Sequence, residues 1–193
     1  LKTSFLPRIT ASVAALLTGR KDAGDLLNTL VRRNYFTIRH AGAEGVFEYH
    51  PLFRAFLENR LARALNNKEL AELKSKAAHL LVQAGNIEAS VSLLQQAADW
   101  QELIPLILQQ APQLAQQGRI QTLAEWLHRL PEDLFEETPE LLYWRGICRL
   151  PFNPKEAQEH FERAFNLFKN RHEIGGMFLS CSAVIDAYLY ERN

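Results

Sequence analysis

The chain contains the segment Phe152-Asn153-Pro154-Lys155-Glu156-Ala157-Gln158-Glu159-His160-Phe161-Glu162-Arg163-Ala164. Its small residues Ala157 and Ala164 flank the aromatic Phe161 at helical spacing, and Phe152-Asn153 forms the turn before them. Two similar turns, Gly85-Asn86 and Gly118-Arg119, precede it at successive spacings of 33 and 34 residues. The chain therefore repeats a unit of helix, turn and helix.

The apolar positions after each turn recur with the same period. Successive members are 34 residues apart in two series, Ala89, Leu123 and Ala157, and Leu93, Leu127 and Phe161. A 34-residue period of paired helices is typical of tetratricopeptide repeats, in which stacking of neighbouring units completes the core. Gly146 supplies the small packing position of the last unit. We expect a tetratricopeptide-like α-solenoid over residues 67–193.

Proline and glycine modify this pattern in two places. Pro105 and Pro112 lie within the first helix of the middle unit, where each removes a backbone hydrogen bond, and we expect that helix to be split. Gly175-Gly176 opens a further helix, expected over residues 178–190. The carboxylates of Glu132-Asp133 and Glu136-Glu137 are expected in an exposed loop between units.

Residues 1–66 predict a different module. Helical spacing favours helices over residues 10–17 and 22–33, and Pro51 opens an apolar helix that reaches about Asn66. Between them, residues 35–38 and 46–49 are rich in aromatic and β-branched side chains, and residues 41–45 supply glycines for a turn. Helix, helix, one small β-hairpin and helix is the order of a winged helix, so the fold class expected is mainly α.

The charge distribution supports two modules. The first 65 residues hold ten Lys and Arg against five Asp and Glu, whereas the remainder hold twelve against seventeen. The excess of basic residues is mild, so a solvated face explains it better than a nucleic-acid partner does.

Composition excludes several classes of protein. No apolar run approaches the ~20 residues of a membrane span, and no signal peptide opens the chain, so we expect a cytoplasmic location without membrane contact. Cys148 and Cys181 each lie in an apolar helical pattern and are expected to be small buried side chains. The histidines lack metal-ligand spacing, and no phosphate-binding loop or nucleophile elbow occurs, so we expect neither an enzyme nor a bound cofactor or metal. The chain begins at Leu1 and its one methionine is Met177, which leads us to expect a piece of a longer protein.

Five stretches resemble a known family when taken together. They are residues 47–57, Phe-Glu-Tyr-His-Pro-Leu-Phe-Arg-Ala-Phe-Leu, then Ala77-Ala78 and Ala84-Gly85-Asn86, residues 118–123, Gly-Arg-Ile-Gln-Thr-Leu, and residues 126–131, Trp-Leu-His-Arg-Leu-Pro. Their order and spacing resemble the MalT-type family of large ATP-dependent, LuxR-class transcriptional activators, over about residues 1–165. The resemblance implies a regulator with an ATPase of the STAND class, a winged helix, a helical-repeat sensor arm and a DNA-binding helix-turn-helix. This chain would hold the second part and the start of the third.

The resemblance implies a role for His50. It corresponds to the histidine that STAND-class winged helices direct at the phosphate of bound ADP, which the ATPase of the parent protein would hold. The alternative reading is that His50 caps the helix that starts at Pro51. On this hypothesis ADP locks the winged helix onto the ATPase, and ATP together with inducer releases it.

Direct DNA reading by the winged helix is not expected. Its second helix starts with Asp22 and Asp25, where contacts to bases or phosphates would require cations, and only Arg32 and Arg33 at the far end are basic.

The first helices of the repeats predict a groove surface. The positions expected to face it are Gln109, Gln113, Gln116, Glu140, Tyr143, Ile147 and Leu150. Such a surface suits a small polar inducer or a partner peptide, although glutamines on a helix are also ordinary solvated surface. Trp126 follows the apolar spacing and is expected in the core, whereas the roles of Trp100 and Trp144 stay open.

Two function classes follow from these features. The first is a regulatory segment that joins the nucleotide state of the parent's ATPase to the sensing of an inducer or regulatory protein. The second is a stand-alone repeat adaptor for a protein partner. The winged-helix module favours the first, since an adaptor would not need it.

Overall fold

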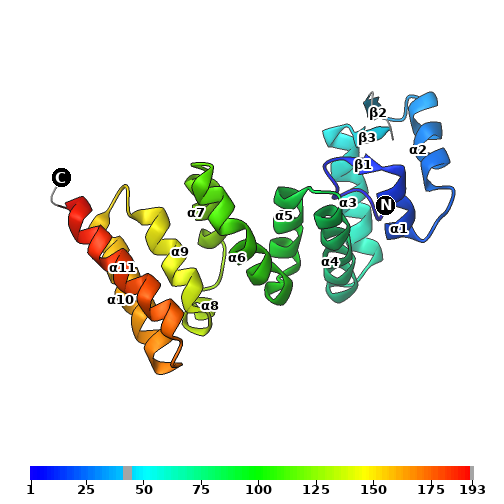
Figure 1. Cartoon of the computed structure of the whole chain (residues 1–193). Helices are drawn as coiled ribbons and strands as arrows, with labels where there is room; N and C mark the ends of the chain where they lie inside the picture. The colour runs from blue at the N-terminus through cyan, green and yellow to red at the C-terminus, as the bar shows by residue number, and fades with distance from the viewer. Residues whose placement is uncertain (41–44, 192–193) are drawn as a thin grey trace. The chain divides into compact units, whose positions relative to one another are not determined.

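The computed structural model describes residues 1–40 and 45–191 (Figure 1). The chain packs as two compact units, Leu1–Leu103 and Ile104–Asn193. The predicted boundary at residues 66 and 67 falls inside the first unit and stays a prediction. The elements before the division are β1 (Ile9–Thr10), α1 (Ala11–Thr18), α2 (Ala23–Arg32), β2 (Thr37–His40), β3 (Val46–Tyr49), α3 (Pro51–Ala64), α4 (Asn67–Gln83) and α5 (Ile87–Ala97).

The winged-helix module has the predicted order of helices and a larger sheet than predicted. The expected hairpin is present, with β2 and β3 antiparallel and Thr37 opposite Tyr49. A third strand, β1, pairs with the other edge of β3 and places Ile9 opposite Phe47, which gives the order β1-β3-β2. Most of the turn predicted at residues 41–45 lies outside the described residues. The predicted mainly helical fold class is confirmed.

The core of this module forms where α1 and α2 meet the sheet. Ile9, Leu17 and Phe47 are buried, and the hydroxyl of buried Tyr49 lies 2.9 Å from that of Thr3. Burial raises the pKa of the Tyr49 phenol, so the group is neutral and can share that hydrogen bond. Helix α1 starts at Thr10, whose hydroxyl accepts from the backbone N–H of Val13.

The antiparallel pair α4 and α5 has clear start and stop signals. At the start of α4, the Asn66 side chain accepts from the Glu69 backbone while the Glu69 carboxylate accepts from the Asn66 backbone, which forms a capping box. Gly85 adopts φ +75° in the turn that precedes α5. The predicted turn at Gly85-Asn86 therefore lies between two helices.

Helix α6 (Trp100–Gln116), within which the two units divide, corrects one prediction. It runs unbroken through Pro105 and Pro112, where the sequence predicted a split helix. Both prolines are exposed and seven residues apart, hence on one outer face where water can bind the carbonyls that lose an N–H partner. The opposite face carries a continuous buried stripe, Leu103, Ile107, Ala111 and Leu114, whose packing holds the helix together.

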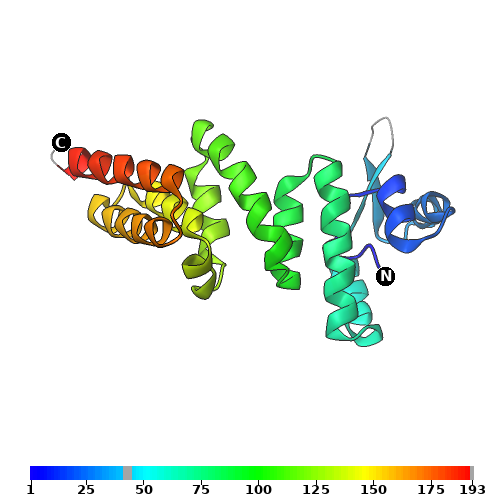
Figure 2. The ribbon, with the colours of Figure 1, turned by 60° about the horizontal axis from the view of Figure 1, so that its bottom comes forward.

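The second unit continues with α7 (Ile120–His128), α8 (Asp133–Glu137), α9 (Pro139–Arg149), α10 (Pro154–Asn170) and α11 (Ile174–Glu191). The segment expected to be a loop around Glu136 is thus the short helix α8. Helices α9, α10 and α11 pack against one another, and α10 and α11 lie side by side in Figures 1 and 2. Leu123, Leu127, Ala157 and Phe161, four of the repeat positions, are buried here, and Trp126 is buried as predicted.

Glycines allow the close packing of these last helices. A Cβ built on Gly146 of α9 would overlap the ring of Phe161, and one built on Gly176 of α11 would overlap the ring of Phe168. Gly146 is therefore the small packing position that the repeat pattern predicts.

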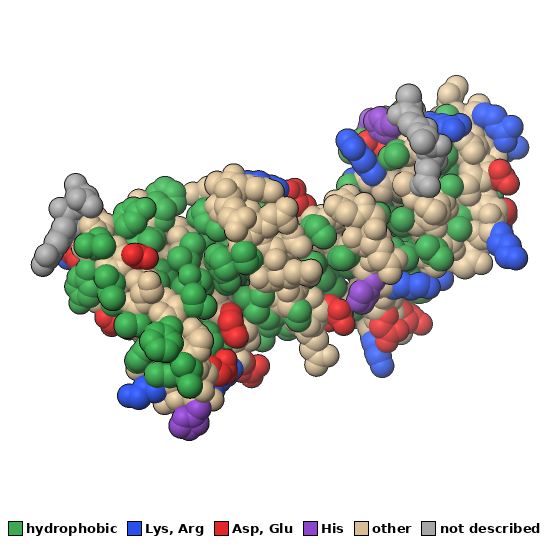
Figure 3. Space-filling model, viewed as in Figure 1, with side chains coloured by type: hydrophobic (Ala, Val, Ile, Leu, Met, Phe, Trp, Pro, Cys, Tyr) green, Lys and Arg blue, Asp and Glu red, His purple; other side chains and the backbone are tan. Residues whose placement is uncertain are grey.

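The two cysteines differ, which corrects a second prediction. Cys148 is buried, whereas Cys181 is exposed. The buried face of α11 is formed by Ser180, Ala183 and Ala187, and Cys181 projects roughly 100° from Ser180 around the helix, toward solvent. Figure 3 shows hydrophobic side chains gathered on the surface of the C-terminal helices. The large exposed residues of α11 are Ile174, Phe178, Leu179, Ile185, Tyr188, Leu189 and Tyr190.

Candidate functional site

His50 caps helix α3. Its Nδ1 accepts a hydrogen bond from the backbone N–H of Leu52 at 3.3 Å, and Pro51 occupies the first helical position. The capping role that the sequence allowed is therefore present. Because Nδ1 is an acceptor, the neutral ring carries its proton on Nε2. The side chain is exposed, so this N–H is available to an external acceptor.

Apolar side chains lie next to His50 on one side at the surface. The ring of Phe36 lies 6.2 Å from the His50 ring and 6.2 Å from Phe53, which stacks on Phe56 at 6.5 Å. Phe36, Phe56 and Leu52 are 66%, 53% and 77% exposed. Three aromatic or aliphatic side chains beside one another in water are unusual for a free surface, so this aromatic surface (Phe36, Leu52, Phe53 and Phe56) is a candidate interface.

The backbone at Phe36 is strained. It adopts φ +45°, a left-handed conformation that costs a bulky residue about 1 to 2 kcal/mol. The Phe36 carbonyl accepts from the His50 backbone N–H at 2.7 Å, which fixes the strained residue next to the histidine. Strain of this kind concentrates at functional sites.

The residues predicted to face a groove lie in two environments. Gln109, Gln113 and Gln116 are exposed on α6, and Glu140 is partly exposed on α9. Tyr143, Ile147 and Leu150 instead pack against the apolar cluster of Ala157, Phe161, Ala183 and Ala187, with the Tyr143 and Phe161 rings 5.8 Å apart. Packing therefore covers part of Tyr143. Ligand binding by Gln109, Gln113, Gln116, Glu140 and Tyr143 stays a prediction.

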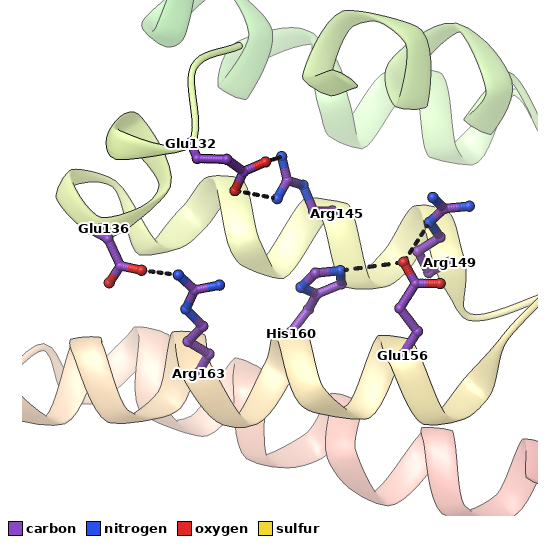
Figure 4. A network of polar contacts seen from close by, with 7 residues as sticks. All are labelled: Glu132, Glu136, Arg145, Arg149, Glu156, His160 and Arg163. Carbon is purple, nitrogen blue, oxygen red and sulfur yellow. Dashed lines mark hydrogen bonds and ion pairs between the residues drawn. The ribbon is translucent and has the colours of Figure 1, made fainter. Parts of the chain in front are cut away.

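A polar cavity that no sequence pattern indicates lies within the second unit. It measures about 430 Å³, is open to solvent, and is lined by residues of α7, α9 and α10 together with Glu132. Figure 4 shows the ion pairs along its wall. Glu132 accepts two hydrogen bonds from the terminal nitrogens of Arg145, at 3.0 and 2.9 Å, and Arg149 Nε lies 3.1 Å from Glu156.

Arg145 is held firmly in this wall. Its guanidinium lies 3.4 Å from the ring centroid of the fully buried Phe135, and its side chain is 19% exposed. The hydrogen bonds from Arg145 lower the pKa of the Glu132 carboxyl below its ordinary value, so the pair stays charged over a wide pH range. A further ion pair joins Glu136 to Arg163 of α10 (Figure 4).

Cys148 and His160 line the same cavity. Burial raises the pKa of the Cys148 thiol to about 12, so the thiol is neutral and unreactive near neutral pH. Burial, followed by the charge of Arg145, lowers the pKa of His160 although Glu156 opposes the shift. Over residues 1–40 and 45–191, no group of three or more His, Cys, Asp or Glu side chains is arranged to hold a metal ion.

Comparison with known proteins identifies the relatives of the chain. Residues 1–69 match the family model described as the MalT winged helix domain. Over 141 residues, 73% of the chain, the sequence is 30% identical to the HTH-type transcriptional regulator MalT of Yersinia pestis (strain Pestoides F). The same protein of Yersinia pseudotuberculosis serotype O:3 (strain YPIII) matches with equal identity and length. The chain is related to the MalT-type transcriptional regulators.

The matched region is a small part of these regulators, since it spans 16% of the length of the two relatives. The MalT-type winged helix domain at residues 1–69 contains His50, the aromatic surface and the first residues of α4. The polar cavity lies outside it. In the described ranges, no helix is long and apolar enough to cross a membrane.

Proposed function

We propose that the chain is the regulatory segment of a signal-responsive, ATP-dependent transcription regulator. In this proposal the winged helix reports the nucleotide state of an ATPase domain in the same protein, and the helical repeats bind an inducer or a regulatory protein. ATP and ADP are cofactors of that ATPase domain. The chain itself carries out no reaction and does not bind DNA, which a separate domain of the regulator contacts.

The observation that carries the proposal is the hydrogen bond from the Leu52 backbone N–H to His50 Nδ1. With Nδ1 engaged by the Leu52 N–H, the exposed Nε2–H can donate to a phosphate oxygen brought up by another domain. The start of α3 adds the partial positive charge of a helix N-terminus at the same place. An anion such as the β-phosphate of ADP is the ligand that this pair of features favours.

The aromatic surface supports a domain interface around the histidine. Phe36, Leu52 and Phe56 expose most of their side chains beside His50, and burying them against a second domain would remove several apolar side chains from water. The hydrogen bond from the His50 backbone N–H to the Phe36 carbonyl, 2.7 Å long, joins this surface to the histidine before docking. Nucleotide contact and domain docking would then occur on one face.

The experiment uses the whole-length natural protein and separates capping from phosphate contact. His50→Asn keeps a side-chain oxygen that can cap α3 but replaces the outward Nε2–H with the N–H groups of a shorter amide, which reach less far, whereas His50→Ala removes both the cap and the donor. We expect copurified ADP in the unchanged protein and its loss or weakened retention in both variants. His172→Asn, in the exposed turn between α10 and α11, is the matched control and should retain ADP. Retention of ADP by His50→Asn and His50→Ala would contradict the proposal.

The second candidate function is a stand-alone adaptor. The exposed apolar side chains of α11 favour it, because such a helix face suits another protein surface. A whole-length protein that copurifies without nucleotide and lacks a phosphate-binding loop would support the adaptor and contradict the regulator.

A further inference from the structure

The winged-helix module contains an open, mainly apolar pocket where α1 and α2 pack against each other (Figure 1). It measures about 470 Å³, a volume typical of sites for small molecules. Leu1 and Thr3 of the N-terminal segment, together with Tyr35 and Tyr49, complete its wall. All of these residues belong to the first compact unit, so this α1–α2 pocket is defined within one module.

Helix α2 supplies a stripe of side chains to the wall. Its members recur at three- and four-residue spacing and so share one face, which ends at the residue after the helix: Ala23, Leu26, Leu27, Leu30 and Arg33. Ala23 and Leu27 are buried, whereas Leu26 is 45% exposed and Leu30 is partly exposed. The neighbouring elements therefore cover only one side of the stripe, and its other side can contact an apolar ligand.

Tyr35 lies at the edge of the pocket, and its backbone is bonded on both sides. Its N–H donates to the carbonyl of Leu30 at 2.9 Å, and its carbonyl accepts from the hydroxyl of Thr37 at 2.8 Å. The side chain lines the pocket and is 49% exposed. The backbone of Tyr35 is thus joined to α2 and to β2 without a ligand, and its ring offers a further apolar surface.

The polar side chains deeper in the wall are uncharged and already hydrogen-bonded. The hydroxyls of Thr3 and Tyr49 lie 2.9 Å apart. Those of Thr18 and Thr29 donate to backbone carbonyls one turn earlier, at 2.6 and 2.8 Å. Because these groups have partners, an apolar part of a ligand can lie against them without leaving a hydrogen bond unmade.

Two arginines line the pocket, and they differ in their partners. Arg20 donates to both carboxylate oxygens of Asp22, at 2.9 and 2.7 Å. The guanidinium of Arg33 is exposed and makes no hydrogen bond or ion pair within residues 1–40 and 45–191. None of the described residues that line the pocket is Asp or Glu. A carboxylate at Arg33 would therefore meet an unengaged pair of N–H groups and no competing carboxylate in the wall.

These features define the chemistry of the ligand. Arg33 supplies one positive charge, which one carboxylate balances, whereas a doubly charged phosphate would need a second cation. An apolar chain or ring matches the stripe of α2 and the ring of Tyr35.

We infer that the α1–α2 pocket binds a small apolar molecule with a single carboxylate. Its apolar part lies against Leu26, Leu30 and Tyr35, and its carboxylate binds the guanidinium of Arg33. The inference goes beyond the proposed function, because it uses neither His50 nor the helical repeats.

The experiment follows the amide NMR spectrum of the complete 193-residue chain with three probes that share parts of this ligand. Hexanoate has the chain and the carboxylate, 1-hexanol has the chain alone, and acetate has the carboxylate alone. We expect hexanoate to shift the amide signals of α2 and Tyr35 with a Kd of about 1 mM. We expect 1-hexanol to bind at least about fivefold more weakly, and acetate to shift none of these signals at about 10 mM.

Two matched pairs of variants test the contacts. Arg33→Gln should weaken hexanoate binding at least about fivefold and leave 1-hexanol unchanged, since it removes the guanidinium and keeps the terminal amino group of Leu1. Its control is Arg32→Gln, because Arg32 is exposed and does not line the pocket, and binding should stay within about twofold. Leu26→Ser should weaken both hexanoate and 1-hexanol. Its control is Leu16→Ser, at an exposed position of α1 outside the lining.

Three outcomes would overturn the inference. The first is the absence of amide shifts in α2 with hexanoate at about 10 mM, ten times the expected Kd. The second is equal affinity for hexanoate and 1-hexanol, because the pocket would then not recognise the carboxylate. The third is an equal loss of hexanoate binding in Arg33→Gln and Arg32→Gln, which would be a general effect of charge. The amide spectrum of each variant also verifies that it is folded.

Discussion

Gly146 of α9 lies so close to the ring of Phe161 of α10 that a Cβ at residue 146 would overlap the aromatic ring. Both residues are buried, and Phe161 also contacts Tyr143. Gly146→Ala therefore overpacks the contact, and we expect the free energy of unfolding to fall by about 1 to 3 kcal/mol in urea titration. Gly175→Ala is the control because its Cβ meets open space on α11, and it should be neutral or slightly stabilising. Equal effects of the two substitutions would show that helix propensity, not packing, determines the change in the free energy of unfolding.

The same contact shows which parts of the fold the sequence could predict. Gly146, Ala157 and Phe161 belong to a pattern of small and aromatic side chains with a fixed period, and such a pattern is local enough to read from the chain. Strand β1 has only two residues, Ile9 and Thr10, and exists because it pairs with the edge of β3. No local sequence pattern predicts a strand that forms only by pairing with a strand distant in the sequence.

The prediction that α6 is split at its prolines is wrong for a related reason. The rule that proline breaks a helix concerns the backbone alone, whereas Pro105 and Pro112 lie on the exposed side of a helix whose other face is buried. The burial of Leu103 through Leu114 outweighs two missing hydrogen bonds. At 100° per residue, both prolines lie on the side of the helix opposite the apolar stripe.

The candidate sites also differ in how far the sequence could predict them. His50 could be located from residues 47–57 because the cap, the proline and the strand before them are contiguous. The cavity could not be located, since Glu132, Arg145 and His160 come from a loop and two helices and meet only after α9 and α10 pack. The aromatic surface is intermediate. The sequence places Phe36 in a strand and Leu52, Phe53 and Phe56 in an apolar helix, but their exposure appears only in the structure.

The reactivity of the two thiols provides a second prediction. Cys181 is exposed and should react with Ellman's reagent quickly, whereas the thiol of Cys148 is buried with its pKa raised to about 12 by burial and should react only on unfolding. We expect one thiol in the fast phase in native buffer and two in denaturant. Cys181→Ser should abolish the fast phase and Cys148→Ser should leave it intact. A fast phase that survives Cys181→Ser would contradict the placement of α11.

The bond pattern of Arg145 leads to a third prediction. Its guanidinium donates twice to Glu132 and stacks on Phe135, which an ammonium group cannot reproduce. Arg145→Lys should lower the free energy of unfolding by about 1 to 3 kcal/mol, as measured by urea titration. Arg149→Lys is the control, because Arg149 is more exposed and makes a single ion pair, and its effect should stay below about 1 kcal/mol. A similar loss in both variants would mean that the stacked geometry contributes nothing.

The last prediction concerns pH. Burial and the neighbouring arginines lower the pKa of His160 in the folded chain, so the unfolded chain binds a proton at this residue more readily. Its contribution to stability is present above the unfolded pKa of about 6.5 and is lost as the pH falls through the folded pKa. Unfolding free energies at about pH 7.5 and pH 5.5 should therefore differ less in His160→Gln than in the unchanged chain. Glu156→Gln removes the one carboxylate that raises the pKa of His160, and it should make the difference larger. If the difference in unfolding free energy between the two pH values were unchanged in both variants, the acid sensitivity would belong to another group. His160 and its nearest carboxylate would then bind protons equally in the folded and unfolded chains.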